Sequence, residues 1–321
     1  MESKASAPGK AILFGEHAVV FGQPALAFAV DKRAYVSLKK SSGKKSTIKS
    51  TDLNFEASFD LSRGIDILKN QKKGIVNYIL GALSLGHDGS PLEIELSMEM
   101  PVGAGMGSSA AVTVATLAAA YNLHQKNIDI SNLAKKAHEV ELMVQGAASP
   151  LDTAVSTHGG LVYLDENSEI SSHQAYLDNS LILGYTSYRG NTGEMVDSVR
   201  KRRERFPQIM DPVIESVGNI TRQALKLLSQ DNLDKEYLGE LMNINQGLLD
   251  SMGVNTPELS RMIFNARKYG ALGSKITGAG GGGSIIAFCP GKLEEVLHIL
   301  QKTDSAINAD FSKEGVLIHH K

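Results

Sequence analysis

The stretch Pro101-Val-Gly-Ala-Gly-Met-Gly-Ser-Ser-Ala-Ala111 leads directly into an Ala-rich apolar segment that continues to Leu123. Glycines at positions 103, 105 and 107 let the backbone turn with its N–H groups facing inward, because no Cβ atom obstructs them. The Ala-rich segment predicts a buried helix, whose first N–H groups and positive dipole end would face the same point. A glycine loop that opens onto a helix is typical of a phosphate-binding site.

Two serines stand at the mouth of this loop. The hydroxyl of Ser108 or Ser109 could reach a phosphate or its Mg²⁺. A glycine-rich turn with a serine N-cap would explain the same residues, and the loop alone does not decide between these interpretations. The chain contains no Gly-Lys-Ser/Thr, which excludes a Walker A loop. It also lacks His-Arg-Asp and Asp-Phe-Gly, which excludes a protein kinase.

A second glycine-rich stretch, Gly278-Ala-Gly-Gly-Gly-Gly283, formally contains G-x-G-x-x-G. A dinucleotide-binding fold would need a helix after it, whereas Ser284–Phe288 predicts a strand. We interpret the stretch as a tight loop pressed against a ligand or another backbone, with a flexible hairpin as the alternative.

The bulk composition is that of an ordinary globular protein. The 321 residues are 42% hydrophobic and 21% charged, and the length suffices for two domains. A net charge of −2 gives no reason to expect nucleic acid or a membrane surface as a partner. The lone Cys289 cannot form an internal disulfide, and no segment predicts a secretion signal or a membrane span. We therefore expect a cytoplasmic protein.

Apolar periodicity predicts a mixed α+β chain in two halves, with domains at 1–170 and 171–321. Strands are expected at 11–14, 25–38, 92–98, 160–164, 181–185 and 285–288. Helices are expected at 73–85, 110–123, 131–146, 192–206, 212–229 and 257–269, followed by a final helix and strand. Residues 15–23 predict a loop, and the Lys-rich residues 41–51 a hairpin tip or surface loop. Ser131 is the expected N-cap of its helix and Gly146 the C-cap.

Three charged residues are candidates for chemistry. Glu141 borders the buried face of its helix and needs a partner, either a divalent cation or a salt bridge, unless it is solvated. Lys10 enters an apolar strand, which is unusual for an unpaired lysine. Asp152 taken alone is better explained as the N-cap of the segment that follows it. The basic run Arg200–Arg205 is interpreted as a solvated helix face.

Three blocks of sequence, in the same order, resemble the GHMP kinases. They are Ala7-Pro-Gly-Lys-Ala-Ile-Leu-Phe-Gly-Glu-His-Ala-Val-Val-Phe-Gly22, the loop at 101–111, and Lys275-Ile-Thr-Gly-Ala-Gly-Gly-Gly-Gly-Ser284. The resemblance implies a two-domain fold, with an N-terminal domain like ribosomal protein S5 domain 2 and a C-terminal ferredoxin-like α/β sandwich.

Within that superfamily the chain resembles the mevalonate kinases, through Gly-Glu-His-Ala-Val-Val at 15–20 and the spacing of Glu141 and Asp152. Ala147-Ala-Ser-Pro150 replaces the family's usual Asn-Pro-Ser-Gly, as in archaeal members. The implied activity is ATP-dependent phosphorylation of the C5 hydroxyl of (R)-mevalonate, with ADP as product. The resemblance also implies a homodimer.

The resemblance assigns roles to particular residues. Asp152 and Lys10 would be catalytic, with Asp152 facing the C5 hydroxyl, and Ser109 and Glu141 would hold Mg²⁺. Glu16, His17, Thr192 and Ala279 would bind the substrate. The ATP phosphates would be wrapped by Gly103, Ala104, Gly105, Met106, Gly107, Ser108 and Ser109.

Other activities on the same fold remain open at this stage. The acceptor could be phosphomevalonate, homoserine or a sugar, and a related decarboxylase also phosphorylates a mevalonate derivative. A binding protein with a degenerate kinase fold is a further alternative, which the presence of Lys10, Ser109, Glu141 and Asp152 disfavours.

Overall fold

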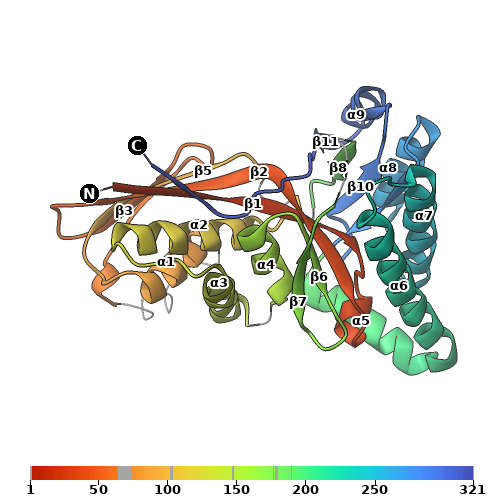
Figure 1. The fold of residues 1–321 in the computed structure, drawn as a ribbon, viewed down its shortest axis with the longest axis horizontal. Coiled ribbons are helices and arrows are strands. Elements are labelled where there is room, and N and C mark those ends of the chain that lie inside the picture. The colour runs from red at the N-terminus through yellow and green to blue at the C-terminus, as the bar shows by residue number, and fades with distance from the viewer. Residues whose placement is uncertain are drawn as a thin grey trace.

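The computed structural model describes residues 2–63, 74–101, 104–146, 148–175, 177, 180–188 and 190–320. Its elements form two sheets, each with its own helices, at opposite ends of an elongated molecule (Figure 1). The two chain termini lie close together at one end (Figure 1).

The first sheet has the strand order β12-β1-β2-β5-β3-β4, with β6 pairing with β2 and β7 with β6. Its strands are β1 (Glu2–Phe14), β2 (Ala25–Lys40), β3 (Ser46–Ser50), β4 (Phe55–Phe59), β5 (Leu92–Met98), β6 (Leu161–Leu164), β7 (Ile170–His173) and β12 (Leu317–His319). The long antiparallel pair β1–β2 forms its centre. The turn after β1 requires Gly15, whose φ is +97° and whose Cβ would overlap the backbone of Pro24 and Ala25.

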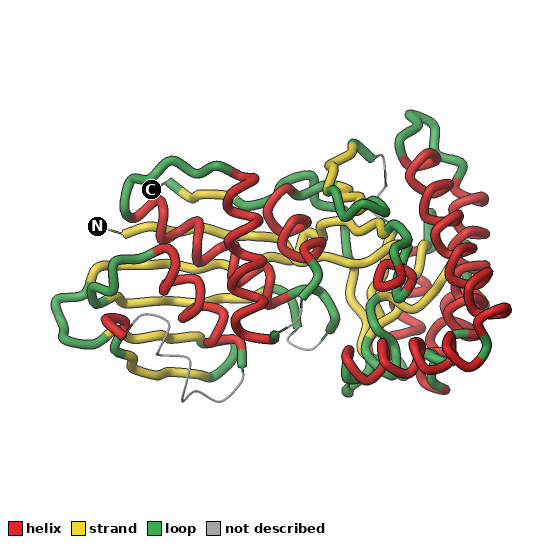
Figure 2. The backbone as a smooth tube through the Cα atoms, turned by 90° about the horizontal axis from the view of Figure 1, so that it is seen from below, coloured by secondary structure: helices red, strands yellow, loops and turns green. Residues whose placement is uncertain are grey.

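Helices cover one face of this sheet (Figures 1 and 2). They are α1 (Ile75–Gly86), α2 (Ser108–Leu123), α3 (Ile130–Gln145) and α4 (Pro150–His158). Helix α2 is buried on all sides, which is why its sequence is Ala-rich throughout instead of amphipathic. It lies between the sheet and α1 and α3, so it is held fixed along its whole length.

The second sheet is antiparallel, in the order β11-β8-β10-β9. Its strands are β8 (Leu181–Tyr185), β9 (Gly273–Thr277), β10 (Ser284–Phe288) and β11 (Ser305–Asn308). The accompanying helices are α5 (Thr192–Arg205), α6 (Pro207–Leu228), α7 (Lys235–Ser251), α8 (Pro257–Lys268) and α9 (Leu293–Gln301). A short 3₁₀ helix, η1 (Ala18–Phe21), follows β1. One buried cluster contains residues of both sheets, including Phe28 of β2 and Phe288 of β10.

The predicted α+β class and most elements agree with the structure, and β5 and β8 have the predicted bounds. Several details differ. Strand β1 begins at Glu2 instead of residue 11, and β4, β7, β9 and η1 were not predicted. Strand β3 lies within the stretch expected to be a loop, helices α4 and α7 were not predicted, and α6 begins at Pro207 instead of residue 212. The side chain of Asp129, not Ser131, caps α3 by accepting a hydrogen bond from the Ser131 N–H.

The domain boundary near residue 170 remains a prediction. Strands β7 and β12, on its C-terminal side, pair with the first sheet. Within the described ranges, no helix is long and apolar enough to cross a membrane.

Candidate active site

The glycine loop before α2 lies directly against Lys10 of β1. The Lys10 N–H donates a hydrogen bond to the Met106 carbonyl at 2.9 Å. Gly107 has φ +64°, and a Cβ there would lie 2.8 Å from Cγ of Lys10. Glycine is therefore required at this position for two reasons. It adopts the left-handed backbone conformation, and it leaves space for the aliphatic part of the Lys10 side chain. Gly103 lies outside the described residues, so its predicted role stays a prediction.

The N-terminus of α2 has no side chain that caps it, because its N-cap residue is Gly107. Its first N–H groups are thus left for a ligand, and the helix dipole adds a positive potential there. The Ser109 hydroxyl donates a hydrogen bond to Oε1 of Glu141 at 2.9 Å instead of capping the helix. The loop and helix have the donor arrangement expected of a phosphate site.

Glu141 is buried on α3, with 2% of its surface exposed. Burial, reinforced by the negative charge of Asp152, raises the pKa of Glu141 to about 7. The solvated alternative for this residue is therefore wrong. A buried carboxylate beside a serine hydroxyl is an oxygen donor set that suits Mg²⁺.

Asp152 lies in the first turn of α4, and Ser149, not Asp152, is the N-cap of that helix. Its Oδ1 is 3.0 Å from Nζ of Lys10. The Lys10 side chain is 6% exposed, whereas 28% of the Asp152 side chain remains accessible. The carboxylate is thus paired with a buried lysine at the start of a helix, and its accessible part leaves room for another group to reach it.

The second glycine-rich stretch connects β9 to β10, of which only β10 was predicted, and this hairpin contacts β1 and the glycine loop before α2. The Ser284 hydroxyl donates to the Ala104 carbonyl at 2.6 Å. Thr277 bonds both backbone groups of Ile12, accepting from its N–H at 3.1 Å and donating to its carbonyl at 2.8 Å. These contacts join the β9–β10 hairpin to β1 and to the glycine loop before α2, which is called the phosphate loop below.

Glu16 is completely buried and forms an ion pair with Lys275 of β9, which is also fully buried. Asn245 of α7 approaches the other carboxylate oxygen at 3.4 Å. Burial lowers the pKa of Lys275, and the charge of Glu16 opposes this shift. Lys275 was not among the predicted site residues. A lysine before Ile276 in an apolar strand gives the same signal that singled out Lys10.

His17 has the strained φ of +60° and lies beside the second glycine loop. Its Nε2 is 2.8 Å from the carbonyl oxygen of Ala279, which can only accept, so Nε2 carries the proton. Its Nδ1 is buried and has no hydrogen-bond partner among the described residues. Such an unpaired acceptor is where a ligand hydroxyl would bind.

Thr192 begins α5, which follows Asn191, the N-cap residue. The backbone just before it is close to the glycine loop, since a Cβ on Gly190 would overlap the Gly280 carbonyl. The described site residues that the sequence predicted thus lie on β1 and the turn after it, on the loop before α2 and its first turn, on α3, α4 and α5, and on the β9–β10 hairpin.

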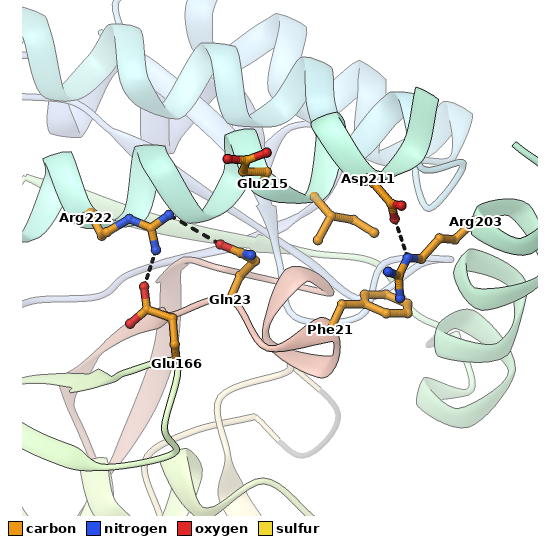
Figure 3. A pocket seen from close by; sticks show the side chains of 8 residues that line it. Phe21, Gln23, Glu166, Arg203, Asp211, Glu215 and Arg222 are labelled. Carbon is orange, nitrogen blue, oxygen red and sulfur yellow. Dashed lines mark hydrogen bonds and ion pairs between the residues drawn. The ribbon is translucent and has the colours of Figure 1, made fainter. Parts of the chain in front are cut away.

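A separate hollow of about 500 Å³ lies between η1 and α6 (Figure 3). Its two arginines are already paired, Arg203 with Asp211 and Arg222 with Glu166. It contains neither the phosphate loop nor the Lys10–Asp152 pair, so we do not assign the chemistry to it.

Comparison with known proteins identifies the class. The model described as "GHMP kinases N terminal domain" matches residues 74–160, and "GHMP kinases C terminal" matches residues 224–306. The chain thus has the two-domain fold of the GHMP kinases, and the glycine loop before α2 lies within the N-terminal match.

Individual relatives show which family within the GHMP kinases the chain belongs to. The mevalonate kinase of Methanothermobacter thermautotrophicus is 48% identical over 317 residues, covering 99% of this chain and 100% of that protein. The mevalonate kinase of Pyrococcus furiosus is 38% identical over 335 residues, covering 99% and 98%. The crystal structure of the Methanococcus jannaschii mevalonate kinase superposes with a TM-score of 0.84 at 28% identity, covering 96% and 98%. The chain belongs to the mevalonate kinase family, and it is an ATP-dependent kinase.

Replacing Lys275 with Met is expected to destabilise the protein by about 3 kcal/mol, because Glu16 would be left as an unpaired buried charge. The double variant Lys275→Met/Glu16→Gln is expected to recover part of this loss. Urea unfolding of the two single variants and the double variant measures the coupling between them. Additive effects would show that the ion pair does not hold the hairpin.

Replacing Glu141 with Gln is expected to remove a pH-dependent loss of stability in the metal-free protein. Folding raises the pKa of Glu141 from 4.5 to about 7, so the folded state holds this proton more tightly than the unfolded chain. Stability therefore falls as the pH rises from about 4.5 to about 7, by on the order of 2 kcal/mol. Urea unfolding in EDTA at the two ends of this range should show the fall in the wild type and a smaller one in Glu141→Gln. Equal pH dependence of both proteins would contradict the assignment.

Proposed function

We propose that the protein transfers the γ-phosphoryl group of ATP to the C5 hydroxyl of (R)-mevalonate, giving 5-phosphomevalonate and ADP. The observation that carries the proposal is the Lys10–Asp152 pair beside the phosphate loop. It places a carboxylate that can accept a proton and a cation that can stabilise phosphoryl oxygens next to the donors for ATP. The 48% identical relative is itself a mevalonate kinase, which supports mevalonate as the acceptor.

In the proposed reaction Asp152 orients the acceptor hydroxyl and accepts its proton. A carboxylate with a usual pKa of about 3.9 is too weak a base to deprotonate a ground-state alcohol. In the loose transition state of phosphoryl transfer, the hydroxyl becomes acidic only as the new O–P bond forms, so a positioned weak base suffices. Lys10 pairs with Asp152 and would place positive charge beside the transferring group.

The remaining residues bind and position the reactants. The free N–H groups at the start of α2 and the loop glycines would hold the ATP phosphates. Ser109 and Glu141 would hold Mg²⁺, which when bound neutralises charge on the phosphate oxygens. His17 would accept a hydrogen bond from the substrate through Nδ1. The ion pair of Glu16 with Lys275 gives Glu16 a positioning role, because no carboxylate oxygen is exposed to a substrate.

The acceptor is tested by measuring ADP release with purified protein and a panel of acceptors. Mevalonate is expected to support turnover, whereas phosphomevalonate, homoserine and galactose are not. Release of CO₂ with a mevalonate derivative would instead indicate the decarboxylase. Absence of turnover with every acceptor would overturn the proposal in favour of a binding protein.

Replacing Asp152 with Asn is expected to lower kcat by about 10²- to 10⁴-fold, because the amide cannot accept the proton. The KM for ATP should change little, since the phosphate loop is untouched. Steady-state kinetics measures both, with the exposed Asp231→Asn as the matched control. A variant within a few-fold of the wild type would remove Asp152 from the chemistry.

Replacing Glu141 with Ala is expected to raise the Mg²⁺ concentration needed for half-maximal activity by about tenfold or more. Glu139→Ala, on the exposed face of the same helix, serves as control and should leave the titration unchanged. An unaltered Mg²⁺ requirement in Glu141→Ala would make Glu141 a structural residue.

We also propose a homodimer in the cytoplasm, from the family resemblance. Sedimentation of the purified protein tests the first of these expectations, which a monomer at enzyme concentrations would contradict.

A further inference from the structure

Two histidines meet where α1 and α2 end. His87 is the C-cap residue of α1 and His124 the C-cap residue of α2. Nδ1 of His87 is 2.8 Å from Nε2 of His124, and the ring centroids are 4.9 Å apart. Gly86 permits this approach, since a Cβ there would lie 3.3 Å from Ala120 and from Leu117 of α2.

The tautomer of His87 follows from its other contact. Nε2 of His87 is 2.8 Å from the Ser90 carbonyl oxygen, which can only accept, so Nε2 carries the proton. The lone pair of Nδ1 therefore points at His124. An imidazole with one nitrogen donating to a backbone carbonyl and the other free is the usual arrangement of a metal-binding histidine. The His87 side chain is fully buried, so its orientation is fixed.

The charges around His87 and His124 favour the binding of a cation. Two helix C-termini converge there, and each carries a partial negative charge. Asp88 adds a carboxylate, whose pKa hydrogen bonds from Ser90 lower to about 2, so it is ionised at neutral pH. Ligand atoms of His87, Asp88 and His124 all lie within 4.8 Å of one another. Oδ1 of Asp88 lies 3.3 Å from the protonated Nε2 of His87, so the carboxylate has to turn toward Nδ1 to reach an ion bound there. Lys40 is the opposing charge that acts on His87, and its side chain is exposed to solvent.

We propose that His87, His124 and Asp88 form a binding site for a transition-metal ion such as Zn²⁺, separate from the nucleotide site. Imidazole nitrogens with one carboxylate suit Zn²⁺, Co²⁺ or Ni²⁺ better than Mg²⁺. The ion takes the place of the Nε2 proton of His124, which moves through solvent to Nδ1 of the same neutral ring. Tetrahedral coordination needs the two nitrogens about 3.3 Å apart, so the two rings separate by about half an ångström.

The proposed metal site lies far from the proposed catalytic residues. Helix α2 has 16 residues and is therefore about 24 Å long, with the phosphate loop at one end and His124 at the other. A bound ion would join the ends of α1 and α2 and stabilise the helix that supports the phosphate loop. The bound ion is therefore expected to raise the stability of the fold and to take no part in phosphoryl transfer.

The test uses the full chain, stripped of metal by a chelator and then kept in excess Mg²⁺ and ADP to occupy the nucleotide site. Co²⁺ is titrated as a spectroscopic probe, and Zn²⁺ is followed by calorimetry and thermal unfolding. The wild type is expected to bind one equivalent, with a visible Co²⁺ spectrum typical of nitrogen ligands, and to unfold at higher temperature with Zn²⁺.

His124→Gln removes a ligand while its amide can still donate to His87, so the metal-free fold is kept. It is expected to weaken binding more than about tenfold and to abolish the Zn²⁺-dependent rise in unfolding temperature. His298→Gln, which removes an exposed imidazole on α9, is the matched control and should bind as the wild type does. Asp88→Asn, at an exposed position, should weaken binding by a smaller factor without affecting folding.

Failure of the wild type to bind a stoichiometric ion would overturn the proposal and leave the two histidines as a hydrogen-bonded pair. Equal affinity in the wild type and both ligand variants would overturn it too, because the ion would then bind elsewhere.

Discussion

The buried ion pair between Glu16 and Lys275 is the contact on which the arrangement of the site depends. Neither charge reaches solvent, so each is tolerated only while the other is in place. Glu16 lies in the turn after β1, and Lys275 lies in β9. The ion pair therefore fixes the β9–β10 hairpin against β1. The bonds from Thr277 to Ile12 and from Ser284 to Ala104 then form in register, and they hold the phosphate loop beside Lys10.

Two carboxylates of the site have different environments and hence different proposed tasks. Asp152 is partly exposed and paired with Lys10, so its free oxygen can meet an acceptor hydroxyl. Glu141 is buried beside Ser109, and its pKa is raised to about 7. A carboxylate that is unfavourable in the metal-free fold gains most from binding a cation. The same buried carboxylate is thus expected to cost stability at neutral pH and to serve Mg²⁺ binding.

Two elements that the sequence failed to predict, β3 and α7, have polar residues at buried positions. In β3 the inward-facing residues are Ser46, Ile48 and Ser50, so only one of the three is apolar and the strand resembles a loop. In α7 the buried face contains Asn245 and Gln246, which bond to Glu16 and to the Ile276 N–H. Apolar periodicity is lost wherever a buried position is used for hydrogen bonding to another element. By contrast, β5 alternates strictly and its bounds were predicted correctly.

The sequence by itself determined what depends on neighbouring residues: the glycine loop before α2, the strand that follows the second glycine loop, and the family to which the chain belongs. Local chemistry was also enough to single out Lys10 and Glu141, because a charge in an apolar pattern requires a partner. Only the tertiary structure decided which partner each charge has. Lys275 is 259 positions from Glu16, and His87 meets His124 only because two helices end together. Pairings at such separations follow from packing of the whole chain, which no local pattern encodes.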